Sequence, residues 1–392
     1  MNEINPFILQ VIISNVPSVL TSGFFPILGS SFGAAIVNIG LFFFLLRIGN
    51  VIGSLISPKI ANKYEPHKIG TVSEVLFAIT TFLILYAVIF KSVEIFIFCS
   101  LFKGIIGGVL SILRFSWLKQ FPDFQKSSRI NLLANVLIQG SYCLVGLFLL
   151  ISNTLQMAIC VLLLDGLGSI FGAFIFWKMK KYYHKKINSD GKNYFKIIKS
   201  LVHTQSRKLL LSIDILICAG LGGTNIMIFS YGEKLFGKEA GYAIALIIYG
   251  LFYFLGGKIV ELKSKGKPIS LNTHVISMAL LVIILSLIFL PNSSSTALKI
   301  TLFSLIFFSF PLINLQVQSE WFKICHKNEA AGISSAEMIY SQVISAAFEI
   351  IYSILRYENI YRAVFLTTAL FLIAFYSISR KTDEKEIIIS TK

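Results

Sequence analysis

Apolar stretches of about 20 residues recur along the whole chain, separated by short polar segments. An α-helix rises about 1.5 Å per residue, so each stretch is long enough to cross a hydrocarbon core of about 30 Å. We therefore expect an all-α membrane protein with 12 transmembrane helices. The pattern places these helices over residues 6–28, 32–57, 70–90, 93–116, 130–151, 156–178, 207–230, 238–256, 269–290, 297–318, 332–355 and 358–378.

The longest polar segment divides the predicted helices into two groups of six. The chain is therefore expected to consist of an N-terminal six-helix half, a cytoplasmic linker, a C-terminal six-helix half and a cytoplasmic tail, over residues 1–178, 179–206, 207–378 and 379–392. Almost no chain is left for a soluble domain. We expect a monomer in contact with the lipid bilayer.

Basic residues gather in the segments on one side of the predicted helices. With both termini inside, the inner segments hold 26 of the 35 Lys and Arg residues and the outer segments hold six. Because cytoplasmic loops carry the basic excess, both termini and the linker are predicted to be cytoplasmic, in a cell inner membrane. Under this orientation Trp117, Trp177 and Trp321 each end an inward-running helix, where an aromatic belt is expected.

Composition supports a membrane protein and excludes several other classes. Hydrophobic residues make up 55% of the chain, charged residues 14%, and the mean hydropathy is +0.78. The net charge of +16 reflects the predicted topology, so nucleic acid is not an expected partner. The five cysteines form no C-x-x-C pair and the five histidines show no metal-ligand spacing. We therefore expect no metal and no other cofactor.

The two halves resemble each other when one is shifted by 199 residues. The shift places 93–116 on 292–315, close to a helix that was predicted independently. It also places the polar segment 58–68 on the segment 257–267, and both segments are short and basic. An internal repeat of this length indicates two related six-helix halves.

Two short motifs connect this repeat to a known family. The segment after helix eight keeps Gly257, an acid at Glu261 and a basic tail, whereas the segment after helix two has Asn62, followed by Lys63, at the acidic position. Helix four carries Lys103 followed by Gly-Ile-Ile-Gly-Gly, which is similar to an Arg-x-x-x-Gly pattern. On these residues the chain resembles the major facilitator superfamily, whose loop motif is Gly, three residues, Asp, Arg or Lys, one residue, Gly.

The resemblance implies a 6+6 pseudo-symmetric architecture in which helices 1, 4, 7 and 10 line a central cavity. It also implies alternating access, with one half rocking against the other around a site at the membrane midplane. In such a protein the two motif segments latch the cytoplasmic side. The resemblance therefore makes Asn62, Lys63, Gly257 and Glu261 the expected gating residues.

Charged and polar side chains inside the predicted helices are the candidates for substrate binding, because an ionisable group in the membrane costs about 2.5–3.5 kcal/mol on insertion scales. Lys103 and Arg47 make the N-terminal half cationic near the midplane, which favours an anionic solute. Salt bridges from these two residues to Asp165 or Asp214 are the structural alternative. The candidate substrate-binding residues are Asn15, Ser18, Arg47, Lys103, Ser111, Asn225, Asn314 and Gln318.

Carboxylates inside the predicted helices are the candidates for proton coupling, because a desolvated carboxylate can take up and release a proton as access alternates. Asp214 in helix seven is the first candidate and Glu337 in helix eleven the second. Packing or gating salt bridges are the alternative for both. Near the cytoplasmic side, Glu74 in helix three and Arg114 in helix four are expected to form a structural ion pair.

These features predict a secondary active transporter that works by alternating access. We expect proton-coupled export, by antiport, of a small anionic metabolite such as a siderophore or a peptide or nucleotide antibiotic, and proton-coupled uptake of an anionic nutrient is the alternative. Helix five has Gly140 and Gly146 without the Gly-Pro of the family's antiporter signature, which argues against an ordinary multidrug antiporter. An enzyme or a non-transporting receptor is the alternative from another class, but no G-x-S-x-G or metal motif supports an enzyme.

Overall fold

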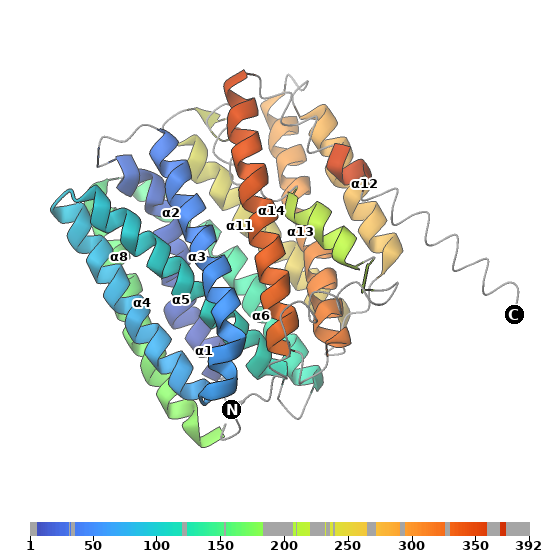
Figure 1. The fold of residues 1–392 in the computed structure, drawn as a ribbon. Coiled ribbons are helices and arrows are strands. Elements are labelled where there is room, and N and C mark those ends of the chain that lie inside the picture. The colour runs from blue at the N-terminus through green and yellow to red at the C-terminus, as the bar shows by residue number, and fades with distance from the viewer. Residues whose placement is uncertain are drawn as a thin grey trace, which may run out of the picture. The chain divides into compact units, whose positions relative to one another are not determined.

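A computed structural model describes the chain as almost entirely helical (Figure 1), and no strand occurs in the parts that it describes. A helical segment lies within each of the twelve predicted ranges. The structure describes residues 6–30, 32, 36–119, 124–152, 154–182, 207–208, 210–219, 232, 236–237, 240–264, 272–290, 295–325, 330–358 and 369–373.

The first helical stretch consists of three consecutive pieces, of which the second is a π-helical turn. These pieces are α1 (Pro6–Gln10), η1 (Val11–Asn15) and α2 (Val16–Ser30). The following elements are α3 (Ile36–Lys63), α4 (Pro66–Ile89), α5 (Val93–Lys119), α6 (Phe124–Gly140), α7 (Tyr142–Ile151), α8 (Leu155–Lys178) and η2 (Met179–Tyr182). After a helix over Leu210–Ala219 come α11 (Gly241–Ser264), α12 (Thr273–Phe289), α13 (Thr296–Ile324) and α14 (Ala330–Glu358).

Length and composition make these helices suitable for crossing a membrane. Within the described residues, eight helices are long and apolar enough to span a bilayer, and two shorter apolar helices cover Leu210–Ala219 and Thr273–Phe289. The chain is therefore an all-α, multi-pass membrane protein, as the hydrophobic pattern predicts.

Two helices extend into segments that were predicted to be loops. α3 continues through Pro58 to Lys63, and α11 continues through Gly257 to Ser264. The apolar pattern marks only the part of a helix that contacts hydrocarbon, whereas the backbone stays helical beyond it. Basic residues in the last turn, Lys63 in α3 and Lys263 in α11, also interact favourably with the helix dipole.

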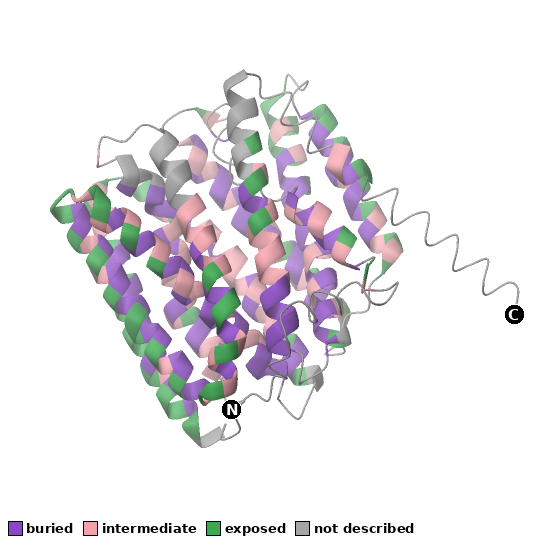
Figure 2. Cartoon of the chain, in the orientation of Figure 1, coloured by how far each residue is buried: buried purple, intermediate pink, exposed green. Residues whose placement is uncertain are grey.

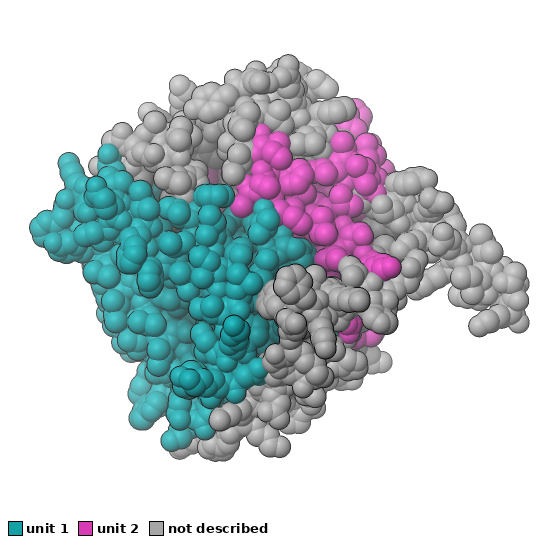
Figure 3. Space-filling model, in the orientation of Figure 1, with its two compact units in different colours: residues 1–200, 325–343 teal, residues 201–324, 344–392 magenta. Residues whose placement is uncertain are grey.

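The chain divides into two compact units (Figure 3). Unit 1 comprises Met1–Ser200 together with Cys325–Val343, and unit 2 comprises Leu201–Ile324 together with Ile344–Lys392. The first half of α14 thus belongs to unit 1 and its second half to unit 2. The predicted linker over 179–206 lies almost entirely outside the described residues.

The same packing pattern occurs in each unit. In unit 1, α5 packs against both α3 and α4, and in unit 2, α13 packs against both α11 and α12. A shift of 199 residues relates these sets of helices, so the repeat in the sequence corresponds to a repeated arrangement of helices.

Apolar and polar residues are sorted between the faces of the helices in unit 1. α4 and α8 expose large apolar side chains at helical spacing, among them Val72, Leu76, Ile79, Leu83, Leu164, Leu167 and Phe171 (Figure 2). Such faces suit contact with lipid tails. Trp177 is 59% exposed, but Trp117 and Trp321 are fully buried, so the expectation of an aromatic belt is wrong for these two. They fill the interior of the helix bundle instead of lying at a lipid interface.

Candidate functional site

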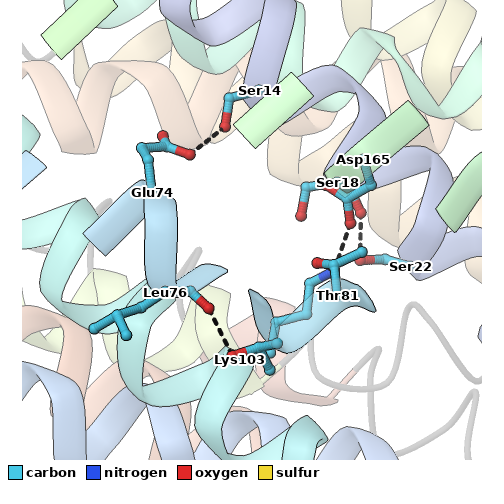
Figure 4. Close-up of polar contacts among 9 residues, drawn as sticks. Ser14, Ser18, Ser22, Glu74, Leu76, Thr81, Lys103 and Asp165 are labelled. Carbon is cyan, nitrogen blue, oxygen red and sulfur yellow. Dashed lines mark hydrogen bonds and ion pairs between the residues drawn. The ribbon is translucent and has the colours of Figure 1, made fainter. Parts of the chain in front are cut away.

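A buried ion pair joins α5 to α8 in unit 1. Lys103 Nζ lies 2.5 Å from Asp165 Oδ2, and the two side chains are 3% and 0% exposed (Figure 4). Lys103 also donates a hydrogen bond of 3.3 Å to Thr81 Oγ1 on α4, and its ammonium lies 4.6 Å from the centre of the Phe77 ring. The structure thus brings together Lys103 and Asp165, the pair named as the salt-bridge alternative for Lys103. The positive charge of Lys103 is therefore balanced by Asp165 inside unit 1.

Glycines fix the direction in which Lys103 points. A Cβ at Gly104 would run into the backbone carbonyl oxygen of Leu46 on α3, and one at Gly108 would run into that of Asn50. α5 can therefore approach α3 this closely only because both positions lack a side chain. With these glycines turned toward α3, Lys103 reaches α4 and α8.

A second ion pair joins α4 to α5 closer to the start of α4. Arg114 Nη2 lies 3.6 Å from Glu74 Oε1, and Glu74 is fully buried whereas the Arg114 side chain is 17% exposed. Glu74 accepts hydrogen bonds from Gln10 Nε2 at 2.5 Å and from Ser14 Oγ at 2.8 Å. Arg114 Nη2 donates a hydrogen bond of 2.6 Å to Asn15 Oδ1. The structure therefore brings together the two residues that were expected to pair.

The π-helical turn η1 supplies a polar partner to each member of this second pair. Ser14 contacts Glu74 and Asn15 contacts Arg114, although the two are adjacent in the sequence. π-Helical turns are rare and are frequently found at functional sites. Gly172 of α8 makes room for this arrangement, because a Cβ there would lie 3.0 Å from Ser14 Cβ and 3.1 Å from Glu74 Cδ. The π-helical turn and the Glu74–Arg114 pair therefore depend on each other, and on the space that Gly172 leaves.

Several predicted substrate-binding residues are only partly buried and lie on the first helical stretch, α3 and α5 of unit 1. They are Asn15, Ser18, Arg47 and Ser111. We call these four residues and Arg114 the polar face of unit 1. Unlike the apolar exposed faces of α4 and α8, this face has polar atoms that can contact water or a solute.

Arg47 extends from this polar face to the first half of α14. Its Nη1 donates a hydrogen bond of 3.0 Å to Gln342 Oε1. A second contact between the same helices joins Ser335 Oγ to the Ser54 carbonyl oxygen at 2.5 Å. Pro58 explains this contact, because proline has no N–H to donate to the carbonyl four residues earlier in α3. The hydroxyl of Ser335 takes the place of that missing backbone donor.

In unit 2 the polar contacts centre on Asp214, which is almost fully buried. Trp321 Nε1 of α13 donates to Asp214 Oδ2 at 3.1 Å, and Cys218 Sγ lies 3.8 Å from Asp214 Oδ1. In addition, Ser345 Oγ donates to the Cys218 carbonyl oxygen at 3.2 Å. Asp214 thus connects the helix over Leu210–Ala219 to α13. The connection uses Trp321, which was expected to lie in an aromatic belt at the membrane interface.

The other candidates in unit 2 are more dispersed. Asn314 Nδ2 donates a hydrogen bond of 3.1 Å to the Tyr253 hydroxyl oxygen, between α13 and α11. Gln318 is partly buried on α13. Asn225 lies outside the described residues, so its predicted role in substrate binding stays a prediction. Glu337 is partly buried on the half of α14 that belongs to unit 1, so it lies in a different unit from Asp214.

The predicted gating residues lie at helix ends. Asn62 and Lys63 form the last turn of α3, and Lys63 Nζ lies 5.4 Å from the centre of the Tyr64 ring. Gly257 and Glu261 lie within α11, where Glu261 pairs with Lys258. Their predicted location in a loop is wrong, because α11 stays helical through them.

A carboxylate next to the Asn62 segment is also paired. Glu65, at the start of α4, lies 2.9 Å from Lys68 Nζ. The hydrogen bond from Lys68 lowers the pKa of the Glu65 carboxyl below its ordinary value. Glu65 therefore stays ionised at neutral pH and contributes a fixed negative charge beside the basic end of α3.

The structure shows why sequence reasoning missed four of the contacting residues, which are Gln10, Thr81, Trp321 and Gln342. Each is a neutral side chain that becomes important only through a charged partner on another helix. Their place in the sequence carries no signal for that partner. No group of three His, Cys, Asp or Glu side chains suited to a metal ion occurs in the described parts of the chain.

Comparison with known proteins places this arrangement in a familiar fold. The family model described as Major Facilitator Superfamily matches residues 7–349. No curated protein matches the chain in sequence.

Solved structures of transporters are similar along nearly the whole chain. The human organic anion transporter MFSD10 aligns with a TM-score of 0.71 and 12% identity, over 95% of this chain and 96% of that one. A bacterial homologue of the iron transporter ferroportin, in an outward-facing state, aligns with a TM-score of 0.74 and 10% identity, over 97% and 100%. The fucose:proton symporter of E. coli aligns with a TM-score of 0.67 and 12% identity, over 96% and 99%. At these identities the likeness concerns the fold alone.

Proposed function

Because the chain belongs to the major facilitator superfamily, and is thus a secondary transporter rather than an enzyme, we propose that it carries a small anionic solute across the membrane in exchange for, or together with, protons. Alternating access between the two halves is the movement that this fold supports. The proposal concerns three finer points, which are the charge of the solute, the coupling ion and the direction of transport.

The anionic solute is supported by the two guanidinium groups on the polar face of unit 1. Arg47 and Arg114 are both partly buried, so a solute at this face can contact them. A guanidinium group binds carboxylate or phosphate through two parallel hydrogen bonds. Lys103 is a weaker candidate, because it is almost fully buried and already bound to Asp165. One structural neighbour is itself named an organic anion transporter, which agrees with this choice.

Proton coupling is supported by Asp214, a nearly buried carboxylate that joins the helix over Leu210–Ala219 to α13 of unit 2. A proton on such a group removes a charge that is costly in a membrane interior. Another structural neighbour is named a proton symporter. Glu337 remains the second candidate for the same role, from the half of α14 that lies in unit 1.

For the direction of transport, the oligomeric state and the membrane, we keep the expectations drawn from the sequence. We propose export of an anionic metabolite by proton antiport, with proton-coupled uptake of an anionic nutrient as the alternative. We further propose that the protein acts as a monomer in the cell inner membrane, with both termini in the cytoplasm. The sign of the coupling between proton and solute separates export from uptake.

The proposal is tested with full-length protein reconstituted in liposomes that contain a pH-sensitive dye. Small carboxylates and phosphate monoesters are added outside, and the internal pH is followed with and without an imposed pH gradient. We expect proton movement that depends on the protein and on the anion. Matched neutral analogues, such as the methyl esters, should produce none. Coupling to neutral or cationic solutes, without coupling to any anion, would contradict the proposal.

A further inference from the structure

We propose that Glu74 is a proton-binding residue that controls Arg114, so that this site binds one proton and one carboxylate or phosphate group of the solute together. The proposal rests on the anion transport proposed above and deepens it, and it favours the uptake alternative over export by antiport. It assigns a binding role to a pair of residues that the sequence treated as structural.

The site has a balanced charge when nothing is bound. Glu74 carries one negative charge and Arg114 one positive charge, 3.6 Å apart. The π-helical turn contributes only neutral groups, from Ser14 and Asn15. From α8, Asp165 is close enough to act on Glu74 through its charge, but Lys103 neutralises Asp165. Within the described residues, the net charge around Glu74 is therefore set by Glu74 and Arg114.

A single ligand would disturb this balance. A proton on Glu74 alone leaves the Arg114 charge without its carboxylate, and an anion on Arg114 alone adds a negative charge next to Glu74. Both states place a net charge in a region of low dielectric constant, where such charges are costly. With proton and anion bound together, the site is neutral again. The neutral empty state and the neutral doubly occupied state are therefore the two states suited to crossing the membrane.

The surroundings of Glu74 can accommodate the protonated carboxyl. Gln10 is fully buried and donates from Nε2 to Glu74 Oε1, while its own Oε1 has no hydrogen-bond partner among the described residues. A half-turn of the amide would present Oε1 to a protonated Glu74, which then donates the hydrogen bond. Ser14 can likewise change from donor to acceptor. The same partners thus satisfy both protonation states.

Arg114 is also placed to exchange its partner. Asn15 holds one end of the guanidinium through Nη2, whereas Nε is buried without a hydrogen-bond partner among the described residues. Its exposed fraction of 17% contrasts with complete burial of Glu74, so a solute can approach Arg114 but not Glu74. Proton and anion would therefore reach the pair by different routes, and they act on each other only through the charge of the pair.

This coupling has a definite sign. Because the proton and the anion each favour binding of the other, they occupy the site together and cross in the same direction. The site thus predicts proton–anion symport, which corresponds to the uptake alternative when the proton gradient points inward. Export by antiport would require the opposite sign, in which a bound proton weakens anion binding.

The wild-type protein provides the first test. Full-length protein in lipid nanodiscs is titrated with acid while infrared difference spectroscopy records the protonated carboxyl band, with benzoate as the anionic probe. We expect benzoate to shift one carboxyl titration to higher pH. Benzoate affinity should fall about tenfold per pH unit above that titration. A carboxyl titration that benzoate leaves unchanged, or shifts to lower pH, would overturn the proposal.

Two variants test whether the benzoate-sensitive carboxyl band belongs to Glu74. Glu74→Gln fixes the uncharged state, so it should lose the benzoate-sensitive band and bind benzoate independently of pH. The matched control is the double variant Lys103→Met with Asp165→Asn, which removes an equally buried carboxylate together with its partner charge and should keep the band. Persistence of the band in Glu74→Gln assigns it elsewhere and overturns the proposal. If Glu74→Gln is not monodisperse, the charge-balanced double variant Glu74→Gln with Arg114→Gln replaces it and should bind no benzoate.

Liposome flux separates this inference from the function on which it rests. Glu74→Gln should exchange benzoate across the membrane without moving protons, whereas the wild type should move both. If Glu74→Gln moves benzoate and protons like the wild type, the role of Glu74 is refuted while anion transport stands. If wild-type liposomes move no anion at all, the proposed function itself fails.

Discussion

Lys103 and Asp165 form a buried ion pair with an N–O distance of 2.5 Å, between α5 and α8. The sequence had suggested Lys103 as the main contact for an anionic substrate and had left a salt bridge to Asp165 as the alternative. The geometry favours the salt bridge, because the ammonium is almost fully buried and has a carboxylate, a hydroxyl and an aromatic ring as neighbours. The proposed anion-binding role then falls to the two arginines of the polar face.

The first prediction concerns the stability of this pair. Lys103→Ala should destabilise the protein by about 3–5 kcal/mol, because it leaves the Asp165 charge buried without its partner. The double variant Lys103→Met with Asp165→Asn should recover most of this loss. Thermal melting of the purified protein in detergent measures both effects. Lys59→Ala, at an exposed position of α3, is the control. A stable Lys103→Ala protein with weakened solute binding would restore Lys103 as a substrate contact.

A second prediction tests the packing of α5 against α3. Gly108→Ala should destabilise the protein by about 1–3 kcal/mol, because the new Cβ meets the Asn50 backbone carbonyl, which cannot move without shifting α3. Gly107→Ala is the matched control, since its Cβ would meet only the Asn50 side-chain oxygen, at 3.1 Å. Melting temperatures of the two variants should therefore differ clearly. Equal melting temperatures would argue against this close approach of the helices.

The third prediction concerns the Ser54 carbonyl. Ser335→Ala should cost about 1–3 kcal/mol, because a buried carbonyl loses its donor. In a Pro58→Ala background the same substitution should cost less, since residue 58 then supplies the missing backbone N–H. A double-mutant cycle measured by thermal unfolding gives the coupling between the two positions. Additive effects would mean that Pro58 does not create the need for Ser335.

A fourth prediction concerns Asp214. Asp214→Asn should abolish transport driven by a pH gradient while exchange of the anion across the membrane continues, because the variant cannot change its charge. Trp321→Phe removes the hydrogen bond that stabilises the ionised carboxylate, so transport should remain and its pH dependence should shift to higher pH. Both variants are assayed in liposomes. Full gradient-driven transport by Asp214→Asn would leave proton coupling to Glu74 alone or move the role of Asp214 to Glu337.

The fifth prediction concerns topology. Reporter fusions after Lys186 and at Lys392 should both give a cytoplasmic signal, because the basic excess lies on their side of the predicted helices. Both fusion sites lie outside the described residues, so the test is independent of the structure. A fusion after Lys91, in the short turn between α4 and α5, is the control and should read outside. An external signal at Lys186 would contradict the predicted arrangement of helices.

Sequence alone determined the class of protein and the approximate position of the helices. A hydrophobic stretch of about 20 residues indicates a segment surrounded by lipid or packed in the helix bundle. The constant spacing of similar segments indicates the internal repeat. For this reason the predicted ranges contain helices, and the resemblance in the Gly257 and Lys103 segments led to the family that residues 7–349 match. The ends of α3 and α11 were missed, because the boundary of an apolar pattern is not the end of a helix.

Only the tertiary structure decided which side chains meet. Lys103, Ser111 and Arg114 share one side of α5 by helical periodicity, but the glycines that pack against α3 set the direction of that side. The first helical stretch shows the same limit, because a regular α-helix turns by about 100° per residue and this stretch does not do so throughout. The π-helical turn changes that angle, and it directs the adjacent Ser14 and Asn15 to opposite members of the Glu74–Arg114 pair. Such contacts depend on the packing of distant helices, about which local sequence carries no information.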